Sequence, residues 1–146
     1  MSMLNGLNIS ASGMTAQRLR LDIISQNIAN VNTTRDAKGN PYQRKMVIFS
    51  EKGTSKSFGE ILGDEVKGNG SGVKVTKIFD DDKTAMRKVY DPSHPDADED
   101  GYVTYPNVNV VQEMTDMIDA SRSYEANVTA FNATKNMALK ALEIGK

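Results

Sequence analysis

The chain has 146 residues, a hydrophobic content of 38%, an aromatic content of 6% and a formal net charge of -1. This length suits one core domain, or a small domain with extended arms, and so few aromatic residues argue against a large aromatic-rich core. The charge is far from the basic balance that is typical of nucleic-acid binding. Because the sequence contains no cysteine, disulfides, thiolate metal sites and thiol nucleophiles are excluded.

The first residues carry no cleavable export signal. Residues 1–8 contain no basic run, and no continuous apolar segment follows them. No stretch of the chain approaches the roughly 18 consecutive apolar residues that indicate a membrane-spanning helix. We therefore expect no membrane span, and a protein that stays in the cytosol or is exported by a route that does not read a cleavable signal.

Residues 3–32 have the periodicity of one long helix. Apolar side chains recur at every seventh position along one seam, at Leu7, Met14, Leu21 and Ile28. A companion seam holds Met3, Ile24 and Val31 but is interrupted by Ser10 and Gln17. Asn30 to Thr34 predicts the end of the helix, because Asn tolerates a left-handed C-terminal position and Thr disfavours continuation.

The polar side of this first helix is made almost entirely of neutral amides and hydroxyls. Its only charged residues are Arg18, Arg20 and Asp22. A solvated helix normally carries interspersed Lys and Glu, whereas hydrogen-bonded neutral groups cost less to remove from water than charges do. We expect this face to be buried against neighbours, with Gly6 and Gly13 permitting close approach at about 1 kcal/mol each in helix propensity. An ordinary helix in a two-helix core explains the pattern equally well.

The middle of the chain predicts a small β-rich region. Strands are expected at residues 42–50, 73–79, 86–90 and 102–105, separated by turn signals rich in Gly, Pro and Asp. Residues 51–72 are rich in Gly, Ser and Lys, and we expect mobility there.

Residues 107–146 predict a second long helix with heptad spacing. One seam holds Val110, Met117, Tyr124, Phe131 and Ala138, and the other holds Met114, Val128 and Leu142. Asn107 or Asn109 can cap the helix, and Gln112, three residues after Asn109, makes a capping-box arrangement.

The predicted fold is therefore mainly α with a small β-rich middle domain. The domain bounds are 1–34 for the N-terminal helix, 35–106 for the middle domain and 107–146 for the C-terminal helix. We expect the two helices to pair as an antiparallel-type coiled coil.

Asp96 to Gly101 matches the opening D-x-D-x-D-G of an EF-hand calcium loop. The loop needs a bidentate Glu at its twelfth position, where this chain has Asn107, and Pro95 precludes an entering helix. A solvated acidic turn is the favoured interpretation. A soluble calcium-binding or interaction module that uses this loop remains the alternative function.

No catalytic constellation is visible. His94 is the only histidine, so zinc sites of the usual types cannot be built. No G-x-S-x-G motif occurs, and Gly68, Gly70 and Gly72 lack the features of a phosphate loop. We expect neither an enzyme nor a cofactor or metal site.

Both ends of the chain resemble the bacterial flagellar rod and hook proteins. The N-terminal similarity covers Ser12 to Thr34, in which Ala29, Asn30 and Thr33 meet the Ala-Asn-x-x-Thr core of the family motif. The C-terminal similarity lies in Met117 to Val128 and Lys140 to Gly145. Residues 35–40 intervene before Pro41 and Tyr42, a departure from many family members that resembles the proximal rod proteins.

The resemblance implies a structural subunit of the flagellar basal-body rod, within the cell envelope across the periplasm. It implies helical assembly through the terminal helices into a torque-transmitting drive shaft that also walls the export channel. The implied partners are copies of itself, other rod proteins and the flagellar type III export apparatus, with the MS ring and the LP-ring bushing nearby, and neither nucleic acid nor membrane.

On this reading the predicted assembly interface comprises both heptad stripes and the polar motif positions. Its residues are Leu7, Met14, Leu21, Ile24, Ile28, Asn27, Asn30, Thr33, Val110, Met114, Met117, Tyr124, Val128, Phe131 and Leu142.

Overall fold

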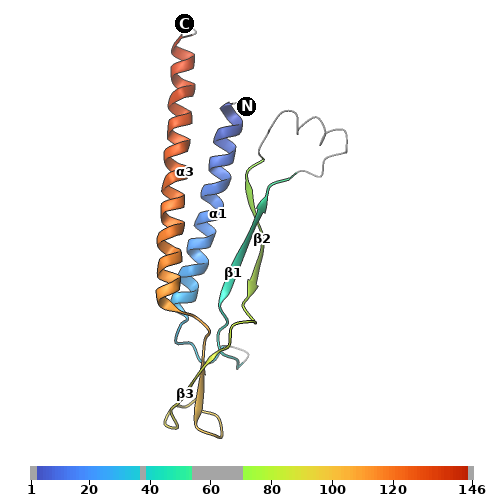
Figure 1. Cartoon of the computed structure of the whole chain (residues 1–146), viewed down its shortest axis with the longest axis vertical. Helices are drawn as coiled ribbons and strands as arrows, with labels where there is room; N and C mark the ends of the chain where they lie inside the picture. The colour runs from blue at the N-terminus through green and yellow to red at the C-terminus, as the bar shows by residue number, and fades with distance from the viewer. Residues whose placement is uncertain (1–2, 37–38, 54–70, 145–146) are drawn as a thin grey trace. The chain divides into compact units, whose positions relative to one another are not determined.

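The computed structural model of the protein describes residues 3–36, 39–53 and 71–144. The elements in chain order are α1 (Met3–Ala29), β1 (Lys45–Glu51), β2 (Val73–Asp80), β3 (Arg87–Tyr90), β4 (Tyr102–Tyr105) and α3 (Val110–Ile144), as Figure 1 shows. Terminal helices with a small antiparallel-sheet region between them confirm the predicted fold class at this level. Most of the segment expected to be mobile, residues 54–70, lies outside the described residues. No helix among those described has the length and apolarity to cross a membrane.

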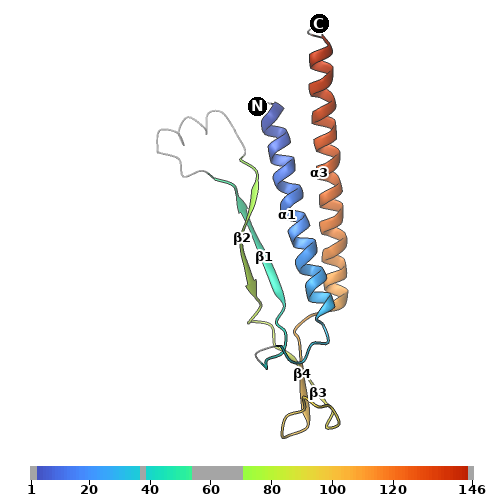
Figure 2. The same ribbon diagram turned by 180° about the vertical axis from the view of Figure 1, so that it is seen from behind.

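The four strands form two separate two-stranded sheets, β1 with β2 and β3 with β4; β4 is labelled in Figure 2. β3 and β4 are antiparallel, with Arg87 opposite Tyr105 and Tyr90 opposite Tyr102. The predicted strands are confirmed, although β1 begins later than residue 42. The reason is that the backbone N–H of Arg44 donates to the Asn107 side chain at 2.9 Å instead of to a neighbouring strand.

The chain forms two compact units, and each terminal helix contributes to both. Unit 1 comprises residues 1–19, 48–76 and 120–146, and unit 2 comprises residues 20–47 and 77–119.

In unit 1, α1 and α3 approach each other through small residues. A methyl group built on Gly6 would lie 3.7 Å from the Thr134 side chain, and one built on Gly13 would lie 2.8 Å from Asn127 Oδ1. The lower-numbered glycine meets the higher-numbered partner, so the two helices run antiparallel here. The expectation that these glycines permit close approach is confirmed at Gly13.

The start of β2 packs on α1 at Ser12. The Ser12 hydroxyl accepts the backbone N–H of Val73 at 3.0 Å and donates to the carbonyl oxygen of Ile9 at 2.7 Å. Gly72 has a φ of +85°, and a methyl group on it would lie 2.5 Å from Ser12 Oγ. Only glycine fits this position, because both its backbone conformation and its close approach exclude a side chain.

In unit 2, α1 ends with a side-chain cap. The Asn30 amide donates to the carbonyl oxygen of Gln26 at 2.9 Å, and the Thr33 hydroxyl donates to Asn30 Oδ1 at 3.2 Å. The prediction that an Asn ends α1 in a left-handed conformation is wrong, because every positive φ value among the described residues belongs to a glycine. The Ala-Asn-x-x-Thr motif thus ends the helix by satisfying its last carbonyl groups.

Of the two predicted caps of α3, Asn107 and Asn109, the structure uses Asn109. Its Oδ1 accepts the backbone N–H of Val111 at 3.1 Å and that of Gln112 at 3.4 Å. The prediction that Gln112 completes a capping box with Asn109 is wrong. The Gln112 side chain donates to Asp116, one turn ahead at 3.5 Å, because a carboxylate at i+4 offers it a charged acceptor.

Candidate functional site

The most deeply buried polar side chain of α1 is Asn27, which is 1% exposed in unit 2. Its amide nitrogen donates to Glu113 Oε2 at 3.0 Å and to the carbonyl oxygen of Lys45 at 2.9 Å. Its oxygen accepts the Tyr42 hydroxyl and the backbone N–H of Lys45, both at 2.9 Å. An Asn side chain offers two donors and two lone pairs, and here all four are used. One residue thereby ties α1 to β1 and α3.

Glu113 is the charged centre of the site and is also 1% exposed. Its Oε1 lies 2.6 Å from Arg44 Nε. Arg44 also lies 3.5 Å from Asp116, which in turn lies 3.6 Å from Arg20 on α1. A buried carboxylate is tolerated only when it is paired and hydrogen-bonded, and both conditions are met here.

Asn107 fixes the chain on the other side of Arg44. Its amide nitrogen donates to the carbonyl oxygens of Asp81 at 2.7 Å and Thr84 at 3.2 Å, while its oxygen accepts the Arg44 N–H. Asp81 itself accepts the Thr84 hydroxyl at 2.7 Å and the backbone N–H groups of Lys83 and Thr84. These hydrogen bonds, that from the Thr84 hydroxyl first, lower the pKa of Asp81 because they favour its charged form.

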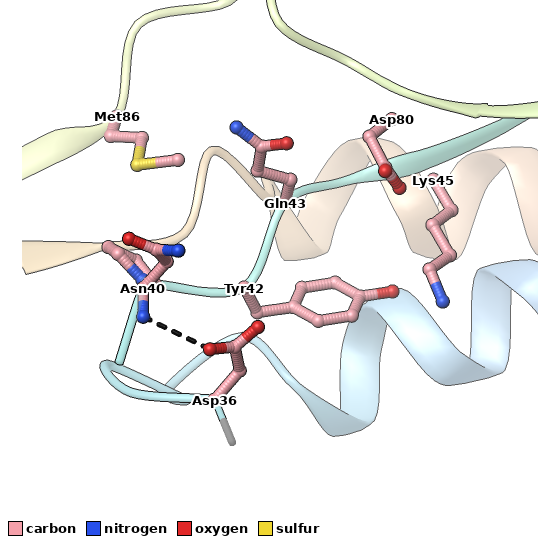
Figure 3. Close-up of a pocket in the computed structure, with 8 residues that line it drawn as sticks. Asp36, Asn40, Tyr42, Gln43, Lys45, Asp80 and Met86 are labelled. Atoms are coloured by element: carbon pink, nitrogen blue, oxygen red, sulfur yellow. Dashed lines mark hydrogen bonds between the residues drawn. The ribbon is translucent and has the colours of Figure 1, made fainter. Parts of the chain in front are cut away.

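Tyr42, which donates to Asn27, also lines an open cavity of about 650 Å³. Figure 3 shows the wall of the cavity, with the ring of Tyr42 between Asp36 and Lys45. Asp36 Oδ1 accepts the backbone N–H of Asn40 at 3.0 Å and so shapes the loop before Tyr42. Burial, followed by the charges of Asp80 and Glu113, raises the pKa of the Tyr42 hydroxyl. The neutral hydroxyl is therefore held as a donor to Asn27.

The segment Asp96 to Gly101, for which calcium binding was the alternative interpretation, is a turn whose carboxylates bind groups of the protein itself. Asp96 accepts the Thr34 hydroxyl at 2.7 Å and pairs with Arg35 at 3.4 Å. Asp98 accepts the backbone N–H groups of Asp100 at 3.2 Å and Tyr102 at 2.8 Å. Among the described residues, no group of three metal-ligating side chains comes together. The loop is built as an Asp-stabilised turn, which leaves the calcium alternative without support.

The predicted assembly residues differ in burial. Ile24 and Asn27 are buried, and Val110, Met114 and Leu142 are exposed. The others are half-buried, namely Leu7, Met14, Leu21, Ile28, Asn30, Thr33, Met117, Tyr124, Val128 and Phe131. The structure joins Asn30 to Thr33 and places Asn27 at the centre of the network.

A second heptad, which the apolar pattern does not reveal, lies one position before the apolar seam of α1. Its members are Gly6, Gly13, Arg20 and Asn27. The matching positions on α3, also seven residues apart, are Glu113, Ala120, Asn127 and Thr134. The contacts named above, between Asn27 and Glu113 in unit 2 and at Gly13 and Gly6 in unit 1, belong to this small-and-polar heptad. The sequence signal of this heptad was the recurrence of small or polar residues at every seventh position.

Arg44, Asp81 and Asn107 were also missed as members of the site. Each is distant in sequence from Asn27 and carries no local motif. Glu113 was missed as well, although its place in the small-and-polar heptad, seven residues before Ala120, pointed to burial.

Comparisons with known proteins agree with the resemblance at both ends. The family described as "Flagella basal body rod protein" matches residues 7–35, and "Flagellar basal body rod FlgEFG protein C-terminal" matches residues 99–144. The flagellar basal-body rod protein FlgC of Bacillus subtilis is 52% identical, with the whole of both chains covered. The chain belongs to the FlgC family of flagellar basal-body rod proteins. It is a structural rod subunit of the bacterial flagellum.

FlgC proteins with lower sequence identity match over almost the same length. That of Borreliella burgdorferi is 46% identical over 99% of this chain and 98% of its own. That of Salmonella typhimurium is 37% identical over the whole of both chains. The similarity therefore includes the middle region, where Arg44, Asp81 and Asn107 lie, and is not confined to the two family motifs.

Proposed function

We propose that this rod subunit assembles helically through its terminal helices and transmits torque through many contacts that are individually weak. The observation that carries the proposal is that two heptads of α1 differ in the contacts they make and in their burial. Members of the small-and-polar heptad make the described contacts between α1 and α3, whereas the apolar seam of Leu7, Met14, Leu21 and Ile28 is only half-buried. Half-buried aliphatic side chains at regular spacing are suited to packing against neighbouring helices.

In this proposal the terminal helices, residues 1–34 and 107–146, pair as a coiled coil and line the export channel. The middle domain, residues 35–106, lies outside them. Because neighbouring subunits supply part of the stabilisation, the ends of the free monomer, residues 1–19 and 120–146, are marginally stable and fold fully only on assembly.

The proposal includes a route and a setting. The subunit leaves the cell through the flagellar type III export apparatus without a cleavable signal and becomes part of the periplasm-spanning rod. Its partners there are copies of itself and other rod proteins, with the MS ring and the LP-ring bushing nearby. The similarity to flagellar basal-body rod proteins over the whole chain supports this setting.

The test is to replace Leu21 or Ile28 with Asp. On assembly either variant would bury an unpaired charge, so rods should be absent and motility lost. Ser25→Asp, at an exposed position on the same helix, is the matched control and should assemble. Electron microscopy of isolated basal bodies and swimming assays provide the readout, and urea unfolding of the purified monomers shows whether the fold survives. Normal rods and motility in both seam variants would contradict the proposal.

A further inference from the structure

β3 is one edge of its two-stranded sheet, and half of its backbone groups point away from β4. The backbone N–H of Asp91 donates to the carbonyl oxygen of Gly101 at 3.0 Å and extends the pairing of β3 with β4. Because bonds across an antiparallel pair are made by alternate residues, the backbone groups of Lys88 and Tyr90 point outward. No described residue bonds to them, and all of β3 is exposed. Such a free edge is a template for pairing with another strand.

The outer edge of β4, by contrast, is closed by the hairpin's own turn where β4 begins. Tyr102 also directs its backbone groups outward, and its carbonyl oxygen accepts the N–H of Asp98 at 2.9 Å. The N–H of Tyr102 donates to the Asp98 side chain at 2.8 Å. Val103, the next residue of β4, is fully buried. The edge along β3 has no such cover among the described residues.

The side chains along the free edge are complementary to themselves. Residues 87–91 read Arg-Lys-Val-Tyr-Asp, with a positive charge at one end and a negative charge at the other. When two copies of this strand pair antiparallel, the outward backbone groups of Lys88 can bond to those of Tyr90 in the second copy. The same register places Arg87 opposite Asp91 of the second copy, in a non-hydrogen-bonded pair, where side chains lie closest.

The neighbouring registers are less favourable. A shift of two residues in one direction places Lys88 opposite Lys88 of the second copy, and like charges directly opposite each other are destabilising. A shift in the other direction places Lys88 opposite Pro92, which has no N–H to donate. Charge and hydrogen bonding therefore favour the same register.

The two charged groups are available for a second copy. Arg87 lies over the ring of Tyr105 at 5.1 Å and forms no ion pair with another described residue. Asp91 uses Oδ1 to accept the hydroxyl of Ser93 at 2.6 Å and its backbone N–H at 3.1 Å. Its Oδ2 accepts no bond from the described part of the chain. The Ser93 contacts hold the Asp91 side chain in place and leave one oxygen for an arginine.

We propose that two copies of the free subunit pair antiparallel along β3, with Arg87 of each copy opposite Asp91 of the other, and join their hairpins into one sheet. The contact uses the same surface twice, so it closes at two copies around a two-fold axis. Because a closed pair cannot continue as a filament, it belongs to subunits before assembly. The interface is small, under about 1,200 Å² in total, so the association is weak, and its exposed ion pairs make it sensitive to salt.

Sedimentation equilibrium of the purified full chain, from micromolar to millimolar concentration, tests the pairing. The chain should convert from monomer to dimer as its concentration rises, and added salt should raise the dissociation constant. Arg87→Asp should stay monomeric, because acidic groups then face each other. Arg122→Asp makes the same change of charge at an exposed position of α3 and should dimerise like the unsubstituted chain. Absence of a dimer at every concentration, or equal dimerisation of both variants, would overturn the proposal.

A mixing experiment tests the register. Arg87→Asp has a negative charge at both ends of the strand, and Asp91→Arg has a positive charge at both ends. Neither variant should pair with itself, whereas a mixture of the two should form a heterodimer, since every basic position again faces an acidic one. Urea unfolding of each variant shows whether its fold survives. A mixture of folded variants that stays monomeric would overturn the proposed register.

Amide exchange of the unsubstituted chain, followed residue by residue by NMR, needs no variant. In the free subunit the N–H groups of Lys88 and Tyr90 point outward, whereas that of Val89 points to β4. A rise in concentration should slow exchange several-fold at Lys88 and Tyr90 and leave Val89 less affected. No change at these two amides, or an equal change at all three, would overturn the contact even if a variant failed to fold. Neither outcome bears on the proposed rod function, which depends on the terminal helices.

Discussion

The two units use the same pair of helices but hold them together by different means. In unit 2 the contact is a saturated hydrogen-bond network around Asn27 and Glu113. In unit 1 the described contact is the close approach of Gly6 and Gly13 to α3. The small-and-polar heptad thus carries directional groups at one end of α1 and almost no side chain at the other. Directional bonds fix the position of the chain segments they join, whereas glycine permits approach but adds flexibility.

The largest expected effect comes from breaking the network in unit 2. Asn27→Asp replaces two donors with a second carboxylate facing Glu113, so we expect a loss of about 3–5 kcal/mol in the free energy of unfolding. Asn32→Asp, at an exposed position just beyond α1, should change stability by less than about 0.5 kcal/mol. Urea unfolding of both variants measures the difference. A similar small change in both would show that the network is not a source of stability.

The next effect concerns the join between β2 and α1 in unit 1. Gly72→Ala would strain a backbone at φ +85° and press a methyl group onto Ser12, for an expected cost of about 1–3 kcal/mol. Gly53→Ala is the control, because nothing lies within 4 Å of its added methyl group. Thermal unfolding should lower the melting temperature of the first variant only. Equal melting temperatures would mean that the Ser12 contact is readily rearranged.

Replacement of the two helical glycines with alanine, measured by urea unfolding, should raise the free energy of unfolding at Gly6 but not at Gly13. Gly6→Ala adds a methyl group at an ordinary contact distance from Thr134, so it should gain up to about 1 kcal/mol in helix propensity. Gly13→Ala would force Asn127 aside and should lose that gain or reverse it. Stabilisation of both variants to the same extent would contradict the close approach of α3 at Gly13.

The smallest expected effect is a pH dependence centred on Asp81. Its pKa in the folded chain is lowered, so the unfolded chain binds more protons as acid is added. This contribution to stability is present above the unfolded pKa of about 4 and disappears as pH falls through the lower folded value. Asp81→Asn should flatten the fall in stability below pH 4, whereas Asp82→Asn, at an exposed neighbouring position, should not. Identical acid profiles would exclude Asp81 as the cause.

The sequence predicted the elements well because their signals are local. Heptad spacing located both helices, and Asn109, the cap of α3, was one of the two caps predicted from position alone. The pairing of the helices was harder to predict, because apolar residues dominate periodicity whereas Gly13 and Asn27 look like polar or flexible interruptions. The network was invisible for another reason: Arg44 and Glu113 are 69 positions apart, and only the folded chain brings them together.

Hydrogen exchange on the purified, verified monomer is the most direct test, because it compares the two parts of α1 in one molecule. Amides in residues 20–29, where Asn27 is held by the network, should be strongly protected, and amides in residues 7–17 should be much less protected. In isolated basal bodies both parts should be protected. Uniformly strong protection from Leu7 to Ile28 in the monomer would contradict the account, since α1 would then need no neighbouring subunit to be stable.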